Sequence, residues 1–190
     1  MNELALEDQI KTLESHLHEK RKELNNLKRK RVGVKIEDYT FKDINGNAIN
    51  LFSLFDERDE LLVIHNMGKS CTYCTLWADG FNGFEKHLSE RLPWFVSSPD
   101  SVEDMKAFAS DRNWNFNMLS SVGNSFKKDM GFENEHGTMP GFSVFHRQSD
   151  GTVYHTSYDS FGPGDLYMPM FHLLELLPKG EDDWTPMKAY

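Results

Sequence analysis

The chain has 190 residues, of which 38% are apolar and 27% are charged, proportions typical of a globular protein and not of a disordered or fibrous one. The sequence has no apolar run long enough to cross a bilayer, and residues 1–4 begin a polar helix and not the core of a signal peptide, so we expect a cytoplasmic protein with no membrane partner. The net charge of −9 disfavours a nucleic-acid partner.

Residues 3–30 are predicted to form one long amphipathic helix. Its apolar positions follow alternating steps of four and three residues, interrupted by Lys20. They are Leu6, Ile10, Leu13, Leu17, Leu24 and Leu27. A single amphipathic helix is marginal in water, so either a second subunit or the chain's own domain must cover this stripe. We favour a homodimer. The pattern breaks at Val32-Gly33-Val34, which predicts an N-terminal helix over 1–33 and a main domain over 34–190.

The main domain is predicted to alternate strands and helices. Asn45-Gly46 indicates a hairpin turn between strands at 39–41 and 48–50, and a helical turn follows at 51–55. The elements then expected are a strand at 61–66, a helix at 71–90, a strand at 94–97, a helix at 101–113 opened by a capping box, a strand at 116–120 and a short helix at 125–130. A second hairpin joins 141–146 to 152–157, and a last helix spans 166–177. This order predicts an α/β fold with a central mixed sheet flanked by helices.

Cys71 and Cys74 are the two cysteines of the chain, and they lie where the predicted strand at 61–66 meets the next helix. Two thiols at this spacing and place are typical of the redox-active dithiol of thioredoxin-like folds. The positive end of the helix dipole favours a thiolate at Cys71. We therefore expect Cys71 to attack a disulfide and Cys74, one turn later, to resolve the mixed disulfide.

Four neighbours of the dithiol are candidates for supporting roles. Thr72 and Tyr73 lie between the thiols and can tune their reduction potential. Trp77 either covers the dithiol or fills the core. Asp79 is either a proton acceptor for Cys74 or a surface acid.

Metal binding competes with redox chemistry as an explanation of the two thiols. A structural zinc site usually needs four Cys or His ligands, and a second cysteine pair is missing from the sequence. His65 and His136 can in principle complete such a set or stabilise a thiolate, although a lone histidine is more often structural. We expect neither a metal nor a cofactor, and keep as the alternative function a binding module that grips a metal or an apolar ligand without turnover.

The run from Cys71 to Gly83, CTYCTLWADGFNG, resembles the signature of a mainly bacterial family of thioredoxin-like proteins, domain of unknown function 899. Met139 to Phe145 is similar to that family's Pro-Gly-x-Ser-Val-Phe, and residues 151–156 and 177–180 match as well. The resemblance covers roughly residues 36–184. It implies a thioredoxin-like fold of the larger, peroxiredoxin-like branch, in which the Met139–Pro140 peptide is cis and Pro140 faces the dithiol. It lends no established substrate.

Thiol peroxidases of the peroxiredoxin type carry Pro-x-x-x-Thr-x-x-Cys. Counted back from Cys74, the Thr and Pro positions are Cys71 and Met67; counted back from Cys71, they are Gly68 and Ile64. Both alignments fail, so peroxidase activity is a weaker prediction than dithiol–disulfide exchange. We expect an oxidoreductase that acts on a protein or small-molecule disulfide or thiol.

Overall fold

A computed structural model describes residues 3–182 and 184–188 of the chain. The chain forms two compact units, and the boundary between them in the sequence lies between Gly33 and Val34. The first contains helix α1 (Glu3–Arg29), in which no residue is buried and Lys28 and Arg29 occupy the last turn. The apolar stripe of the predicted helix is therefore exposed along its length, with Leu13 at 62% and Leu17 at 70%. None of the helices in the described ranges is long and apolar enough to span a bilayer.

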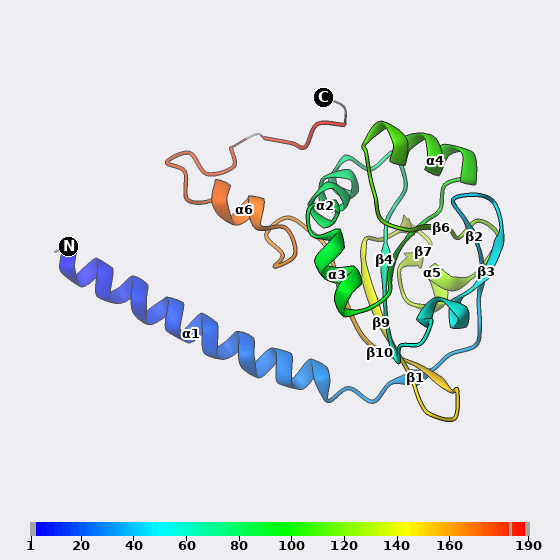
Figure 1. The fold of residues 1–190 in the computed structure, drawn as a ribbon. Helices are drawn as coiled ribbons and strands as arrows, with labels where there is room; N and C mark the ends of the chain where they lie inside the picture. Colours follow the sequence, from blue (N-terminus) through cyan, green and yellow to red (C-terminus); the bar gives the residue numbers. More distant parts are fainter. Residues whose placement is uncertain (1–2, 183, 189–190) are drawn as a thin grey trace. The chain divides into compact units, whose positions relative to one another are not determined.

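The second unit is built on an eight-stranded mixed sheet (Figure 1). Its strands, in chain order, are β1 (Val34–Lys35), β2 (Thr40–Asp43), β3 (Ala48–Asn50), β4 (Glu60–His65), β5 (Trp94–Ser98), β6 (Met118–Ser120), β9 (Gly141–Arg147) and β10 (Val153–Ser160). They lie side by side in the order β1-β10-β9-β4-β5-β6-β2-β3. The three central strands β4, β5 and β6 are parallel, and the outer pairs are antiparallel. A separate small hairpin joins β7 (Glu133–Asn134) to β8 (Gly137–Thr138).

Helices cover both faces of this sheet. They are the 3-10 helix η1 (Leu51–Phe55) and the α-helices α2 (Thr72–Gly83), α3 (Glu85–Arg91), α4 (Val102–Asp111), α5 (Phe126–Asp129) and α6 (Pro169–Leu174). Side chains alternate across β4, so Leu61 and Val63 join a core with η1 and α5, whereas Ile64 joins a second core with α2, α4 and α6. The second core is rich in aromatic rings, and the dithiol helix α2 packs on it.

Two predicted helices differ from the observed ones. The helix expected over 71–90 is interrupted after Gly83, where Phe84 adopts a φ of −121° and two shorter helices result. Asn82 and Gly83 are poor helix formers, which explains the break. The last helix is shorter than predicted, because the Asp165 carboxylate accepts the backbone N–H groups of Tyr167 and Met168 and holds them in a turn before Pro169 begins the helix.

Candidate active site

The loop between β4 and α2 ends at Cys71, Cys74 follows in the first turn of α2, and two side chains hold the loop in place. Asn66 Oδ1 accepts the backbone N–H of Gly68 at 2.7 Å, and Asp100 Oδ2 accepts that of Lys69 at 2.7 Å. Gly68 has a φ of +96°, and a Cβ there would lie 2.9 Å from the Asp100 carboxylate. Only glycine satisfies both conditions without strain, so the approach to the dithiol is fixed by this residue.

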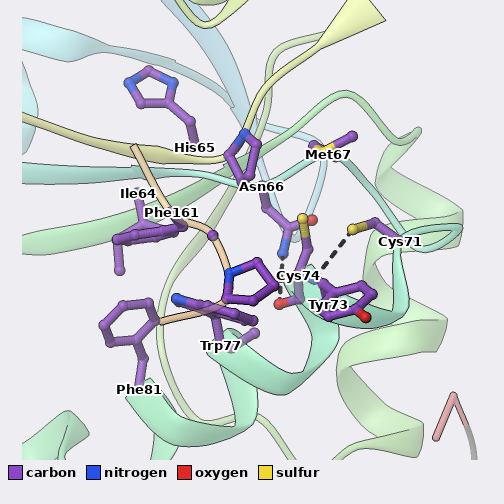
Figure 2. Close-up of a pocket in the computed structure, with 14 residues that line it drawn as sticks. Ile64, His65, Asn66, Met67, Cys71, Tyr73, Cys74, Trp77, Phe81 and Phe161 are labelled. Carbon is purple, nitrogen blue, oxygen red and sulfur yellow. Dashed lines mark hydrogen bonds between the residues drawn. The ribbon is translucent and has the colours of Figure 1, made fainter. Parts of the chain in front are cut away.

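Cys71 is the N-cap of α2, and its sulfur accepts the backbone N–H of Cys74 at 3.1 Å (Figure 2). A thiolate is well placed there, since the first backbone N–H groups of a helix lack partners within the helix. A hydrogen bond from the Cys74 thiol, helped by the backbone N–H groups of residues 74 and 73, lowers the pKa of Cys71 to about 6, against the opposing effect of burial. This geometry supports the prediction that Cys71 is the attacking thiol.

Cys74 lies one turn into α2 and is 5% exposed. Its hydrogen bond to the Cys71 sulfur and its burial raise its pKa far above the ordinary range of a thiol, while a backbone hydrogen bond from Met67 and the charge of Lys127 act in the opposite direction. In the reduced protein the two thiols thus divide into an accessible thiolate and a protected thiol. This is the division of roles that disulfide exchange requires.

Both cysteines open into a cavity of about 250 Å³. Most of its walls are apolar. They comprise Ile64, Met67, Tyr73, Trp77, Ala78, Phe81, Pro140, Phe161, Gly162 and Pro163, together with His65 and Asn66. Asp165 secures the wall formed by residues 161–163, because its carboxylate accepts the Trp77 Nε1–H at 2.9 Å and the Gly162 N–H at 2.9 Å. An apolar group bound beside the sulfurs would be largely removed from water.

The supporting residues predicted from the sequence separate into two groups. Tyr73, Trp77 and Pro140 line the cavity with the cysteines. Trp77 fills the core as well, being 3% exposed. Thr72 begins α2 and does not line the cavity, and Met139 packs into the core on the side of α5.

Asp79 does not line the cavity either. Its carboxylate pairs with the Arg112 guanidinium and accepts the Trp114 Nε1–H at 2.8 Å. It lies five residues after Cys74, about 140° further round the helix, which turns it towards α4. The structure therefore assigns this carboxylate a packing role and gives no support for a proton-acceptor role.

The expectation of a cis peptide before Pro140 is wrong. No peptide bond in the described ranges is cis, that between Met139 and Pro140 included. The trans form is the ordinary state of an X–Pro bond. The Met139 N–H donates to the Phe132 carbonyl at 2.8 Å, and the backbone enters β9 directly after Pro140. Pro140 reaches the dithiol cavity with its peptide trans.

The two candidate histidines differ in their surroundings. The His65 ring is fully buried, stacks on Phe132 with centroids 4.0 Å apart and shares a 2.9 Å hydrogen bond with Ser143 Oγ. The residue contributes to the cavity wall, but its ring lies apart from the two sulfurs in Figure 2. Burial lowers its pKa well below the ordinary value. His136 is exposed and pairs with Glu135. Within residues 3–182 and 184–188, no three His, Cys, Asp or Glu side chains are arranged to hold a metal ion.

Sequence reasoning missed three residues of the site. Asn66 caps the loop and donates from Nδ2 to the Cys74 carbonyl at 3.5 Å (Figure 2). Asp165 closes the cavity wall, and an Asp between glycine and proline residues is a recognisable turn signal. Lys127 is 2% exposed behind the dithiol loop, yet in the sequence it precedes Lys128 and Asp129 and resembles a solvent-facing charge.

Comparison with known proteins supports the fold. The chain is 27% identical over 128 residues to chloroplastic peroxiredoxin Q of Triticum aestivum, a match covering 66% of this chain and 58% of that protein. The peroxidoxin BcpB of Mycobacterium tuberculosis superposes with a TM-score of 0.55 at 21% identity, over 68% of this chain and 85% of that one. A putative protein disulfide isomerase of Bacteroides thetaiotaomicron superposes with a TM-score of 0.52 at 14% identity, over 68% and 79% of the two chains.

These likenesses confirm the thioredoxin-like fold predicted from the order of the elements. The family model described as "Bacterial protein of unknown function (DUF899)" matches residues 3–190, nearly the whole sequence. The match confirms the resemblance carried by the dithiol motif and the Met139–Phe145 run. The chain belongs to the DUF899 family of bacterial proteins.

Proposed function

We propose that the protein is a thiol–disulfide oxidoreductase whose reactive groups are Cys71 and Cys74. The observation that carries the proposal is the Cys71 sulfur at the N-terminus of α2, where it accepts the Cys74 N–H while the Cys74 thiol is buried behind it. A thiolate so placed is nucleophilic near neutral pH.

In this reaction the Cys71 thiolate attacks one sulfur of a partner disulfide, and the second partner sulfur leaves as a thiolate. Cys74 then loses its proton and attacks the Cys71 sulfur. The partner's remaining sulfur leaves and takes up the proton. The two cysteines are oxidised to a disulfide, the partner is reduced to one thiolate and one thiol, and the reaction needs no metal or cofactor.

The cavity beside the sulfurs favours a partner that presents an apolar group next to its reacting sulfur. Tyr73, Trp77 and Pro140 give apolar surface to the cavity that lies beside the two sulfurs. Both a side chain of a protein and a small molecule satisfy this requirement. We propose that the protein acts in the cytoplasm, where a C-x-x-C pair is more often catalytic or metal-binding than structural.

Trapping the mixed disulfide tests this reaction. The Cys74→Ser variant, treated with an aromatic disulfide such as 4,4′-dithiodipyridine, is expected to hold one partner thiol covalently on Cys71. The unaltered protein, which has both cysteines, is expected to release both partner thiols and to gain an internal disulfide. The Cys71→Ser variant is the matched control and should react much more slowly at pH 7. Stable adducts on both cysteines of the full-length protein, without an internal disulfide, would contradict the proposal.

A thiol peroxidase is the second candidate, since two of the proteins compared above carry peroxiredoxin-type names. The missing threonine and proline before either cysteine argue against it. Stopped-flow oxidation by hydrogen peroxide decides: a rate constant far above that of an ordinary thiolate, lost in Cys71→Ser, would favour the peroxidase. Zinc that survives dialysis and is lost with Cys71 would favour the binding module instead.

We also propose that the protein is a homodimer held together by α1. Leu13, Leu17 and Leu27 of the apolar stripe are each more than half exposed, and this stripe gains stability only when covered. Sedimentation velocity at micromolar concentration is expected to give a dimer for the full chain and a monomer for a chain beginning at Val34. A full-length monomer contradicts the proposal, and a dimer of the shorter chain places the interface on residues 34–190.

A further inference from the structure

Lys127 is a buried, ionisable side chain that has no part in the disulfide exchange described so far. It lies in α5 and is 2% exposed, although lysine is almost never fully buried unless it is paired. Among the described side chains, no carboxylate forms an ion pair with its Nζ. A cation held inside a protein without a partner carboxylate calls for an explanation.

The Lys127 ammonium lies at the carboxyl ends of two parallel strands. Nζ donates to the Asn66 carbonyl at 2.9 Å and to the Ser97 carbonyl at 3.2 Å. Asn66 follows β4 directly, Ser97 lies near the end of β5, and open α/β sheets bind their ligands at this edge. The backbone carbonyl of Asn66 therefore holds Lys127, and the side chain of the same asparagine donates to the Cys74 carbonyl.

Four titratable groups act electrostatically on Lys127. Burial lowers the pKa of Lys127 to about 7, and the charges of Cys74, Glu133 and Asp100 oppose that decrease. Asp100 is occupied by the Lys69 backbone and by Ser98 Oγ. The fourth group is His65, and the Lys127 charge contributes to lowering its pKa. Cys74 is the one of these groups that must change charge during disulfide exchange.

We propose that the Lys127 ammonium is the counter-charge that stabilises the Cys74 thiolate while Cys74 resolves the mixed disulfide. This inference rests on the proposed oxidoreductase function. Lys127 is a positioning residue in this account, because it acts on the reacting sulfur through its charge.

The need for a counter-charge arises only in the mixed disulfide. In the reduced protein the Cys74 thiol donates to the Cys71 thiolate. Once Cys71 is bonded to the partner, that negative charge is gone, and Cys74 must become a thiolate in a buried place. The Lys127 charge acts on Cys74, and its ammonium is held on the Asn66 carbonyl next to the dithiol loop. An ammonium and a thiolate together carry no net charge, so the desolvation cost of the resolving nucleophile is partly offset. The Cys74 sulfur then bonds to Cys71, the bond to the partner breaks, and the released partner thiolate receives the proton.

Single-turnover oxidation by 5,5′-dithiobis(2-nitrobenzoate) separates the two steps, because each releases a coloured thiolate. The attack of Cys71 is a phase whose rate rises with reagent concentration, and resolution by Cys74 is a phase whose rate does not. We expect Lys127→Met to slow the second phase at pH 7 by about tenfold or more and to leave the first within about twofold. Lys127→Arg, which keeps the charge, should restore the second phase to within about threefold of the original protein.

Folding and pH supply the controls. Lys127→Gln keeps a hydrogen-bond donor without charge and replaces the Met variant if that one does not fold. Thr156→Val removes a partly buried side-chain hydrogen bond to the Val144 carbonyl, away from Lys127 and the dithiol cavity, and should leave both phases unchanged. The deficit of the uncharged variants should shrink as pH rises above about 7, because Lys127 itself then loses its proton and its charge.

An unchanged second phase in the Met or Gln variant, an equal slowing of both phases, or an Arg variant as slow as Met overturns the role of Lys127. Release of only one coloured thiolate by the unaltered protein overturns the proposed function, and this inference with it.

Discussion

Removal of the Cys74 thiol is expected to raise the pKa of Cys71, because the hydrogen bond from that thiol is the largest influence that lowers it. With a pKa of about 6, Cys71 is about 90% thiolate at pH 7, against about 3% for an ordinary cysteine of pKa about 8.5. Nucleophilicity falls with pKa, with a Brønsted slope of about 0.4–0.5, which reduces this advantage by a factor of about ten. At pH 7 Cys71 should therefore react only about two to three times faster than an ordinary thiol.

The distinction becomes large at lower pH. At pH 5.5 about a quarter of Cys71 is still thiolate, compared with about one part in a thousand of an ordinary cysteine, so its rate advantage grows to about twentyfold. Iodoacetamide alkylation from pH 4.5 to 9.5, followed by mass spectrometry, measures the midpoint directly. It should lie near 6 in the unaltered protein and move upwards, towards that of an ordinary thiol, in Cys74→Ala. A midpoint at or above 8 in the unaltered protein, or an unchanged one in the variant, refutes the reasoning.

Three further outcomes follow from the packing around the site. Gly141→Ala should lower the free energy of unfolding by about 2 kcal/mol, because a Cβ at this position would clash with the Asp159 carbonyl and the Phe132 ring. Gly83→Ala is the control, because a Cβ there meets no atom within 4 Å, and it should be near neutral in urea denaturation. The buried imidazole of His65 should titrate, by NMR, well below an ordinary histidine. Because its pKa is lowered, its contribution to stability falls as pH drops below about 6.5, where the unfolded chain takes up the proton, and an NMR midpoint near 6.5 would contradict this. Asp79→Ala should destabilise the fold by about 2–3 kcal/mol while the alkylation midpoint of Cys71 stays the same, and a displaced midpoint would restore a redox role to this carboxylate.

Much of the fold was predictable because local signals and the global architecture agree. The Asn45-Gly46 turn, the strand before Cys71 and the capping box at Ser101 each produced an element close to its predicted place. The dithiol was recognisable for the same reason, since this spacing at a strand–helix junction is typical of a redox dithiol. The predicted boundaries were wrong where a single side chain determines where a helix begins, as Asp165 does before α6.

The rest of the site depends on tertiary contacts that leave no local trace. Lys127 is one of two adjacent lysines, and only the fold shows that its side chain turns inwards to the ends of β4 and β5. Asp79 has the residue type of a proton acceptor, but its place on α2 turns it towards Arg112. The peptide before Pro140 was assigned cis by resemblance alone, and the observed trans bond shows how weakly a motif constrains backbone geometry.

A redox titration tests the central claim most directly. The full-length protein is equilibrated in buffers of reduced and oxidised glutathione, quenched with acid and alkylated, and its species are counted by mass spectrometry. We expect one two-electron transition from two free thiols to a Cys71–Cys74 disulfide, with glutathione adducts accumulating only on Cys71 of the Cys74→Ser variant. A full-length protein that stays reduced throughout, or that collects glutathione without forming the internal disulfide, would contradict it.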